Sequence, residues 1–448
     1  MATHQSQTDL LPAFSDEALA RGFAARHANE LRYIAATGKW MCWDGTRWCR
    51  DVQLRTVALV RKFCAEMACD PQAAKQAKSI ASAKTIRSVE ALARADFHLA
   101  ATADQWDADQ MALNTPDGVI DLRTGARRPA MPELYMTRIT AVAPGGECPV
   151  FLAFLNQITA GDGELVAYWQ RLLGYVLTGD TSEHALFFGY GTGGNGKSVL
   201  IDTVAGILGN YSRSAPIETF AESGTSRHPT ELAGLQGARL VTAVETEEGR
   251  RWAESRIKTL TGGDKISARF MRQDFFEYQP EFKLLIAGNH KPGLRSVDEA
   301  MRRRFHLIPF PLSLAKGDRD PHLKEKLKAE WPGILAWMIE GSLRWQELGL
   351  RPPTAVTAAT LAYFEAEDLF GSWLEECCEL TSSGWEFAGA LFASWKAFAE
   401  SAGESPGSSK RLSQMLEKRG FEPKRTSHAR GFQGLRFRAT PSNRFSDG

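Results

Sequence analysis

The chain has 448 residues, of which 43 % are hydrophobic and 24 % are charged, as in ordinary globular proteins. This composition excludes wholesale disorder, a collagen-like repeat and a small disulfide scaffold, and at about 100–200 residues per domain the length predicts several domains. The net charge of +1 indicates nothing about polyanions, but residues 384–444 hold eleven Lys or Arg against five Asp or Glu. This excess predicts a basic module at the carboxyl end of the chain.

The first third of the chain mixes helix and strand signals. We expect an amphipathic helix from Asp16 to Ala36, a hairpin around Asp44-Gly45, helical segments to about residue 103, and strands with turns over residues 113–129. The pair Asp107 and Asp109 matches a D-x-D metal pattern, but it lies in a polar helical pattern and is interpreted as a solvated helix face. Glycines and prolines mark a boundary near residue 147.

The cysteines indicate a reducing compartment. The chain has seven, an odd number, and none form a C-x-x-C pair, so we expect free thiols. A zinc site remains an alternative, although the spacing of its possible ligands matches no usual pattern; these are Cys42, Cys49, Cys64 and Cys69. No apolar run approaches the roughly 18–20 residues of a membrane span, and no signal peptide opens the chain, so we expect a cytoplasmic protein without a membrane partner.

Strand and helix signals alternate in the middle of the chain. After a helical stretch over residues 151–181, buried-type strands are expected in HALFFGYG, RLVTAVE, KISARFMR and FKLLIAGN, with helical segments between several of them. This alternation predicts an α/β fold with a parallel sheet covered on both faces.

A glycine-rich loop connects the first of these strands to a helix. Residues 191–198 read GTGGNGKS and fit the phosphate-binding pattern G-x-x-x-x-G-K-[ST]. Glycines let backbone N–H groups turn around a phosphate, Lys197 neutralises its charge, and the Ser198 hydroxyl can ligate Mg²⁺. The loop therefore predicts ATP and Mg²⁺ as cofactors. The expected contacts to the nucleotide are Gly191, Thr192, Gly193, Gly194, Asn195, Gly196, Lys197, Ser198 and Val199.

Polar residues at later strand ends complete the predicted site. Glu245 ends the strand RLVTAVE and is expected to hold Mg²⁺ and activate water, although Glu247 is an alternative for the second role. Asn289 ends the strand FKLLIAG and could sense the terminal phosphate. Arg303 and Arg304 precede the strand HLIPF, where they could supply an arginine finger to a neighbouring subunit.

These motifs, in this order, resemble a superfamily 3 helicase. More closely, residues 150–350 resemble the helicase part of phage and plasmid primases of the satellite-phage/poxvirus type, with weaker similarity on either side. The resemblance implies an AAA+-like ATPase that assembles as a ring, usually a hexamer, and moves along single-stranded DNA. It also implies that Lys258–Arg272 includes a DNA-contacting hairpin; the implied contacts are Lys258, Lys265, Arg269 and Arg272.

Two departures from this family pattern affect the interpretation. Many members have two adjacent acids where this chain has Glu245-Thr246, which leaves the choice between Glu245 and Glu247 open. Relatives often carry a primase-polymerase domain, whereas about 150 residues precede the ATPase motifs here. We therefore expect a helicase without its primase, with a separate primase or polymerase as an open partner.

The basic carboxyl-terminal module independently indicates DNA binding. Residues 391–402 and 412–419 read as helices, and residues 431–437 as a strand pair, which suggests a winged helix. The cations expected to contact phosphates include Lys410, Arg411 and Arg425, and the same segment holds Lys418, Arg419, Lys424, Arg430 and Arg436.

The expected organisation is an amino-terminal α+β domain (1–147), an ATPase domain (148–350), a helical linker (351–380) and a winged-helix-like domain (381–448). The predicted function is ATP-dependent unwinding of forked DNA during replication of a phage, plasmid or mobile element, in a bacterial cytoplasm. A packaging motor, a helicase loader and a non-hydrolysing nucleotide switch are the alternatives. The motor would usually bring a nuclease domain, and the switch would not need a complete hydrolytic set of residues.

Overall fold

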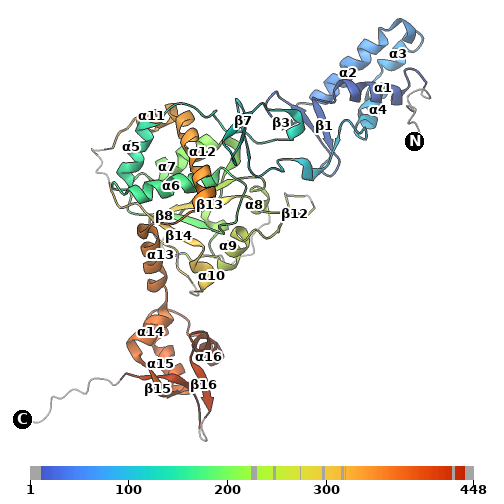
Figure 1. Cartoon of the computed structure of the whole chain (residues 1–448). Coiled ribbons are helices and arrows are strands. Elements are labelled where there is room, and N and C mark those ends of the chain that lie inside the picture. The colour runs from blue at the N-terminus through green and yellow to red at the C-terminus, as the bar shows by residue number, and fades with distance from the viewer. Residues whose placement is uncertain are drawn as a thin grey trace, which may run out of the picture. The chain divides into compact units, whose positions relative to one another are not determined.

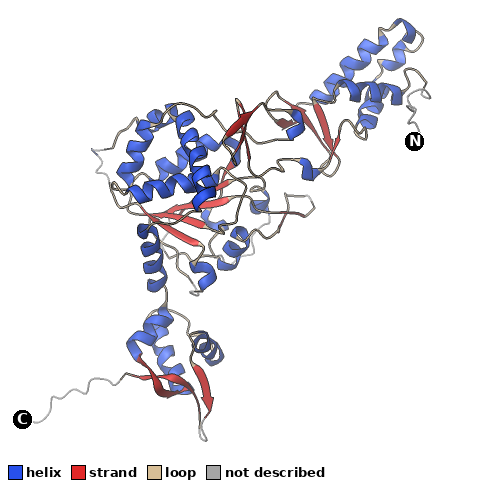
Figure 2. Cartoon of the chain, viewed as in Figure 1, coloured by secondary structure: helices blue, strands red, loops and turns tan. Residues whose placement is uncertain are grey.

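The structure of the chain, a computed structural model, describes residues 12–222, 230–245, 249–272, 274–294, 298–313, 317, 319–425 and 429–438. The chain divides into two compact units (Figure 1). The first comprises residues 1–292 and 303–357, and the second comprises residues 293–302 and 358–448. Figure 2 shows helices and strands mixed in both units, and the chain is an α/β protein.

The amino-terminal part of the first unit combines helices with a four-stranded sheet of order β3-β2-β1-β4. The predicted turn at Asp44-Gly45 joins β2 to β3. The predicted helix over residues 16–36 is too long: it ends at Arg26, because Leu31 and Ile34 are buried as residues of a strand that pairs with β2. The elements are α1 (Asp16–Arg26), β1 (Leu31–Ile34), β2 (Lys39–Trp43), β3 (Trp48–Arg50), α2 (Arg55–Ala68), α3 (Ala77–Ile80), α4 (Ala83–Ala93) and β4 (Ala100–Ala101).

A second, antiparallel sheet confirms the strands expected over residues 113–129. It consists of β5 (Ala112–Thr115), β6 (Gly118–Asp121) and β7 (Ala126–Arg128). The buried guanidinium of Arg239, which immediately precedes a strand of the central sheet, donates to the carbonyl oxygen of Ala112 at 2.7 Å and thereby connects this sheet to the central one.

The prediction of a helix around Asp107 and Asp109 is wrong. Asp107 has φ +51° and accepts a hydrogen bond from the N–H of Thr137 at 2.7 Å, while Asp109 forms an ion pair with Arg123 at 2.9 Å. Both carboxylates therefore have partners within the protein. Among the described residues, no group of three His, Cys, Asp or Glu side chains could hold a metal ion.

Five parallel strands form the central sheet, in the order β14-β8-β13-β10-β9. Three of the four expected runs, HALFFGYG, RLVTAVE and FKLLIAGN, become its inner strands, whereas KISARFMR contributes to a separate two-stranded sheet because it pairs antiparallel with the segment that follows it. Every residue of β13 is buried, as expected for a parallel sheet covered on both faces. In Figure 1, α5, α6, α7 and α12 lie on one side of this sheet and α8 and α9 on the other. The strands are β8 (Leu186–Tyr190), β9 (Ser212–Ser214), β10 (Leu240–Glu245), β13 (Lys283–Gly288) and β14 (Phe305–Pro309).

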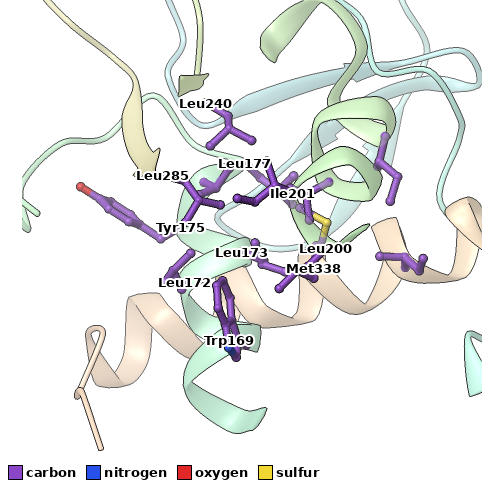
Figure 3. Close-up of a cluster of buried hydrophobic side chains, with 14 of the residues drawn as sticks. Trp169, Leu172, Leu173, Tyr175, Leu177, Leu200, Ile201, Leu240, Leu285 and Met338 are labelled. Carbon is purple, nitrogen blue, oxygen red and sulfur yellow. The ribbon is translucent and has the colours of Figure 1, made fainter. Parts of the chain in front are cut away.

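Helices α6 and α12 approach each other closely at two glycines. A Cβ atom on Gly174 would overlap the backbone nitrogen of Ser342, and one on Gly341 would overlap the carbonyl oxygen of Gln170. Larger residues would push the helices apart. Around this contact, α6, α12, α7 and the sheet share a core that includes Trp169, Leu173, Leu200, Leu285 and Met338 (Figure 3). The helices are α5 (Pro149–Ile158), α6 (Gly163–Val176), α7 (Lys197–Leu208), α8 (Thr230–Ala233), α9 (Glu254–Thr261), α11 (Leu323–Ala329) and α12 (Trp331–Leu348).

The second unit contains the basic module. From α14 onwards its order of helix, strand, two helices and two strands is that of a winged helix, and its core includes Trp373, Trp395, Leu412 and Leu435. Residues 431–437 form one continuous strand and not the predicted strand pair, because this strand pairs on both edges, with β15 and β16. The elements are α10 (Glu299–Arg302), α13 (Thr354–Ala366), α14 (Leu369–Cys377), β15 (Cys378–Phe387), α15 (Ala388–Ser401), α16 (Ser409–Lys418), β16 (Glu422–Arg425) and β17 (Arg430–Phe437).

Candidate functional site

The predicted phosphate loop lies at the carboxyl end of β8 and leads directly into α7, which begins at Lys197. Its backbone takes conformations that favour glycine: φ is +152° at Gly191, +82° at Gly194 and +86° at Gly196. A Cβ on Gly191 would lie only 2.5 Å from the side-chain nitrogen of Asn195. The glycines of the motif are therefore required by the shape of the loop.

The Lys197 side chain is buried inside this loop, and its contacts among the described residues are uncharged acceptors. Its ammonium donates to the carbonyl oxygen of Gly191 at 2.6 Å and to the side-chain oxygens of Asn195 at 3.1 Å and Asn289 at 3.3 Å. Burial lowers the pKa of Lys197. Within the part of the chain that the structure describes, no carboxylate forms an ion pair with this ammonium. A desolvated cation whose described contacts are all uncharged is a suitable partner for an anionic ligand.

Asn195 adds an unused hydrogen-bond donor to the loop. Its side chain is 3 % exposed, and its amide nitrogen has no hydrogen-bond partner among the described residues. Buried polar groups are rarely left unpaired. The unpaired donor, the glycine conformations and the buried ammonium together fit a bound phosphate group. Ser198, in the first turn of α7, is exposed, and Val199 beside it is half-buried.

The other strand-end residues meet at the same edge of the sheet. Glu245 is the last residue of β10 and pairs with Gly288 of β13, which places the backbone of Glu245 beside the strand end that Asn289 follows. The carboxyl ends of parallel strands form the usual ligand-binding edge of such sheets. The side chain of Glu245 and all of Glu247 lie outside the described residues.

Arg303 and Arg304 lie at the amino-terminal ends of the strands, opposite the end that carries the phosphate loop. The carbonyl oxygen of Arg304 accepts a hydrogen bond at 2.7 Å from the N–H of Leu186, the first residue of β8. The phosphate loop follows the last residue of the same strand, so the length of β8, about 16 Å, separates the two positions. These arginines are therefore not part of the phosphate site of their own chain.

The segment that follows β14 contacts the phosphate loop, which sequence patterns did not reveal. The Ser313 hydroxyl donates to the carbonyl oxygen of Gly193 at 3.1 Å, and a Cβ on Gly194 would overlap a guanidinium nitrogen of Arg319. Neither residue belongs to a motif of fixed spacing. They reach the loop because β14 pairs parallel with β8, so the carboxyl ends of these two strands lie side by side.

A hairpin is present between α9 and β13, where the family resemblance implied one. Strands β11 (Ile266–Ala268) and β12 (Phe276–Tyr278) pair antiparallel. Lys265 and Arg272 are exposed beside and within the hairpin, and the Arg269 guanidinium lies 4.7 Å from the ring centre of Phe275. The turn also exposes apolar side chains, those of Phe270, Met271 and Phe275. Lys258 lies in α9 and is half-buried.

The cations of the second unit differ in their partners. Lys410 and Arg411 are exposed at the start of α16, and Arg425 is exposed at the end of β16; within the described residues, none forms an ion pair. In contrast, Arg419 forms an ion pair with Asp368, and Arg436 with Glu379. Lys424 donates to the side-chain oxygen of Gln433 at 2.8 Å.

The described residues contain no helix long and apolar enough to cross a membrane. Two family models match the chain: "D5 N terminal like" over residues 20–160, and a family of unknown function over residues 189–304, which includes the phosphate loop, Glu245 and Asn289.

Viral proteins named as candidate helicases are similar to this chain. A protein of Acanthamoeba polyphaga mimivirus is 26 % identical over 293 residues, which cover 60 % of this chain and 30 % of the relative. A protein of Frog virus 3 is 27 % identical over 253 residues, covering 52 % and 26 %, and one of Invertebrate iridescent virus 6 is 27 % identical over 237 residues, covering 50 % and 24 %. The chain thus spans less than a third of the length of these relatives.

Solved structures share the fold of nearly the whole chain. The A form apo structure of the NrS-1 C terminal region superposes with a TM-score of 0.51 at 10 % identity, covering 94 % of this chain and 99 % of that one. A second structure of the same region gives a TM-score of 0.52 at 10 % identity, with 94 % and 100 % covered. Given the family matches, the helicase-named viral relatives and the phosphate loop in its sheet, this chain is similar to phage and viral primase-helicases.

Proposed function

We propose that the chain is one subunit of a ring-forming superfamily 3 DNA helicase that hydrolyses ATP to move on single-stranded DNA. The observation that carries this proposal is the hydrogen bond between the Lys197 ammonium and the Asn289 side-chain oxygen at 3.3 Å. It joins the loop that would hold the phosphates to the strand end where a terminal phosphate would be sensed. A site for nucleotide binding alone would not need the second residue.

Each side chain of the site would have a separate role in ATP hydrolysis. Lys197 would exchange the loop carbonyl oxygens that it now contacts for phosphate oxygens, and the loop N–H groups would surround the phosphates. Asn289 would orient the attacking water or sense the terminal phosphate. Bound Mg²⁺, held by Ser198 and Glu245, would neutralise charge on the phosphates. Glu245 or Glu247 would accept the proton of the attacking water.

Position supports a role for Arg303 and Arg304 on a neighbouring subunit. A strand length separates them from the phosphate loop of their own chain, so they would act only across an interface between subunits. A guanidinium supplied in this way stabilises charge in the transition state of phosphoryl transfer. This requirement supports a closed ring, and we propose a hexamer.

Two basic surfaces would contact DNA. The hairpin offers Lys265, Arg269 and Arg272 to the phosphate backbone of a single strand, and the winged helix offers the unpaired cations of α16 and β16. Contacts of this kind bind DNA without regard to sequence and weaken as salt rises. The helicase names of the viral relatives support a role on DNA, and we propose forked DNA during replication as the substrate.

The test is ATP hydrolysis by the full chain, with and without single-stranded DNA, together with unwinding of a forked duplex. We expect DNA to stimulate hydrolysis, and Lys197→Ala to abolish it. Lys324→Ala is the matched control, because Lys324 is exposed and forms an ion pair with Asp202 on the outside of α7. Binding of ATP without turnover would identify a nucleotide switch instead, and wild-type turnover by Lys197→Ala would overturn the site.

A further inference from the structure

We propose that Arg319 is a second cationic phosphate contact, acting on the nucleotide held by its own chain. This inference rests on the proposed function, because it assigns a new residue to the same nucleotide site. Arg319 is exposed and lies beyond the last strand of the sheet, outside every motif recognised in the sequence. Its position against the phosphate loop is the observation that carries the proposal.

Three described residues that follow β14 lie against three glycines of the phosphate loop. A Cβ on Gly191 would lie 2.6 Å from the carbonyl oxygen of Phe310, Ser313 donates to the carbonyl oxygen of Gly193, and a Cβ on Gly194 would meet the guanidinium of Arg319. For Gly194 the three nearest atoms all belong to that guanidinium, and the farthest of them would lie 3.1 Å away. The absence of a side chain at this position therefore leaves room for the guanidinium.

The chemistry of the guanidinium suits this position. Lys197 provides one charge from inside the loop, whereas ATP carries several negative charges. A guanidinium remains charged at any physiological pH and can donate two parallel hydrogen bonds to phosphate oxygens. Arg319, resting against the loop at Gly194, would supply a second positive charge without movement of the central sheet.

This role differs from that proposed for Arg303 and Arg304. Arg319 contacts the loop of its own chain, whereas those two arginines lie at the amino-terminal ends of the strands, away from that loop. Removing Arg319 should therefore weaken nucleotide binding in every subunit that carries the change, even in a chain that has not assembled.

The first experiment is titration calorimetry of ATP and of ADP, each with Mg²⁺, on the full chain. We expect Arg319→Ala to weaken binding of both nucleotides about tenfold, as expected when one charge-assisted hydrogen bond is removed, and Arg319→Lys to fall between. The control is Arg123→Ala, an exposed arginine that forms an ion pair with Asp109 in the amino-terminal region; its affinities should equal those of the wild type. Unchanged affinities in Arg319→Ala would overturn the proposal.

Lys197→Ala separates this inference from the proposed function. If Lys197→Ala also leaves nucleotide affinity unchanged, the nucleotide site itself is misplaced. If Lys197→Ala weakens binding and Arg319→Ala does not, only the role of Arg319 fails. A mixture of Arg319→Ala with Lys197→Ala chains supplies a second test at ATP concentrations too low to saturate Arg319→Ala. Since both changes would damage a site within the same chain, the mixture should hydrolyse ATP no faster than the average of the two variants, and a faster rate would contradict the assignment.

Discussion

The hydroxyl oxygen of Tyr168 lies 2.6 Å from Nδ1 of His306 and joins α6 to β14 inside the first unit. Tyr168 is fully buried, and His306 is 9 % exposed. Burial lowers the pKa of His306 to about 4 and raises the pKa of Tyr168 well above its usual value. Both side chains are therefore neutral in the folded protein at neutral pH.

This pair predicts a loss of stability in mild acid. An unfolded chain takes up a proton on His306 below its ordinary pKa of about 6.5, whereas the folded chain does so only near pH 4. The free energy of unfolding should thus fall as the pH drops from 6.5 towards 4, and His306 should contribute about 2 kcal/mol of the loss by pH 5. Urea titrations at pH 7 and pH 5 measure it. In His306→Gln, whose amide cannot titrate, the free energy of unfolding should fall by about 2 kcal/mol less between pH 7 and pH 5 than in the wild type. An equal fall in the two proteins would exclude His306 as the source.

Glu245→Gln should retain ATP binding and stop hydrolysis. An amide can still contact the hydration shell of a metal ion but activates water poorly, so the turnover rate should fall by about 10²-fold or more. Rates of phosphate release and nucleotide affinities, measured side by side, separate the two effects. Glu247→Gln is the matched comparison, and loss of turnover in that variant alone would assign the proton acceptor to Glu247.

Arg303 and Arg304 should act across a subunit interface. The double variant Arg303→Ala/Arg304→Ala should lose about 10³–10⁵-fold in the rate of hydrolysis. Mixing it with Lys197→Ala should restore part of the activity, because some interfaces then combine an intact loop with an intact arginine. The absence of recovery, in rings shown to exchange subunits, would argue against action on the neighbour.

The hairpin should couple hydrolysis to DNA. Lys265→Ala with Arg272→Ala removes exposed cations that lie outside the phosphate site, so basal hydrolysis should remain while stimulation by DNA and unwinding collapse. The slope of log affinity against log salt should also fall by about one for each DNA phosphate that is no longer neutralised. A matched control removes Arg436, whose ion pair with Glu379 occupies its charge. Normal unwinding by the hairpin variant would leave the winged helix as the DNA-binding surface.

Much of the fold could be predicted because its strands are short apolar runs with clear boundaries. The phosphate loop, Asn289 at the end of β13 and the hairpin between β11 and β12 lie where sequence patterns predicted them. The errors arose where distant pairing decided the structure. Leu31 and Ile34 fit a helix by their spacing, but pairing with β2 makes them a strand, and residues 431–437 form one strand because β15 and β16 lie on either side.

The residues of the site that follow β14 were less predictable than those of the phosphate loop. Spacing rules identify Lys197 because its role requires fixed neighbours in sequence. Ser313 and Arg319 have no such neighbours, and they reach the loop only because β14 pairs with β8 and ends beside it. Likewise, the sequence contains no sign that the Asp107 carboxylate would accept a hydrogen bond from the N–H of Thr137, thirty residues away.

The close approach of Gly174 to α12 has a consequence for the order in which the chain can fold during synthesis. The face of α6 stays uncovered until α12 has left the ribosome, and α12 ends at Leu348, well after the last strand of the sheet. A chain shortened after β14 would contain all five strands and the whole phosphate loop, yet it would expose the apolar side of α6, including Leu173. Such a fragment should aggregate, so any independently folding fragment with this sheet has to include α12.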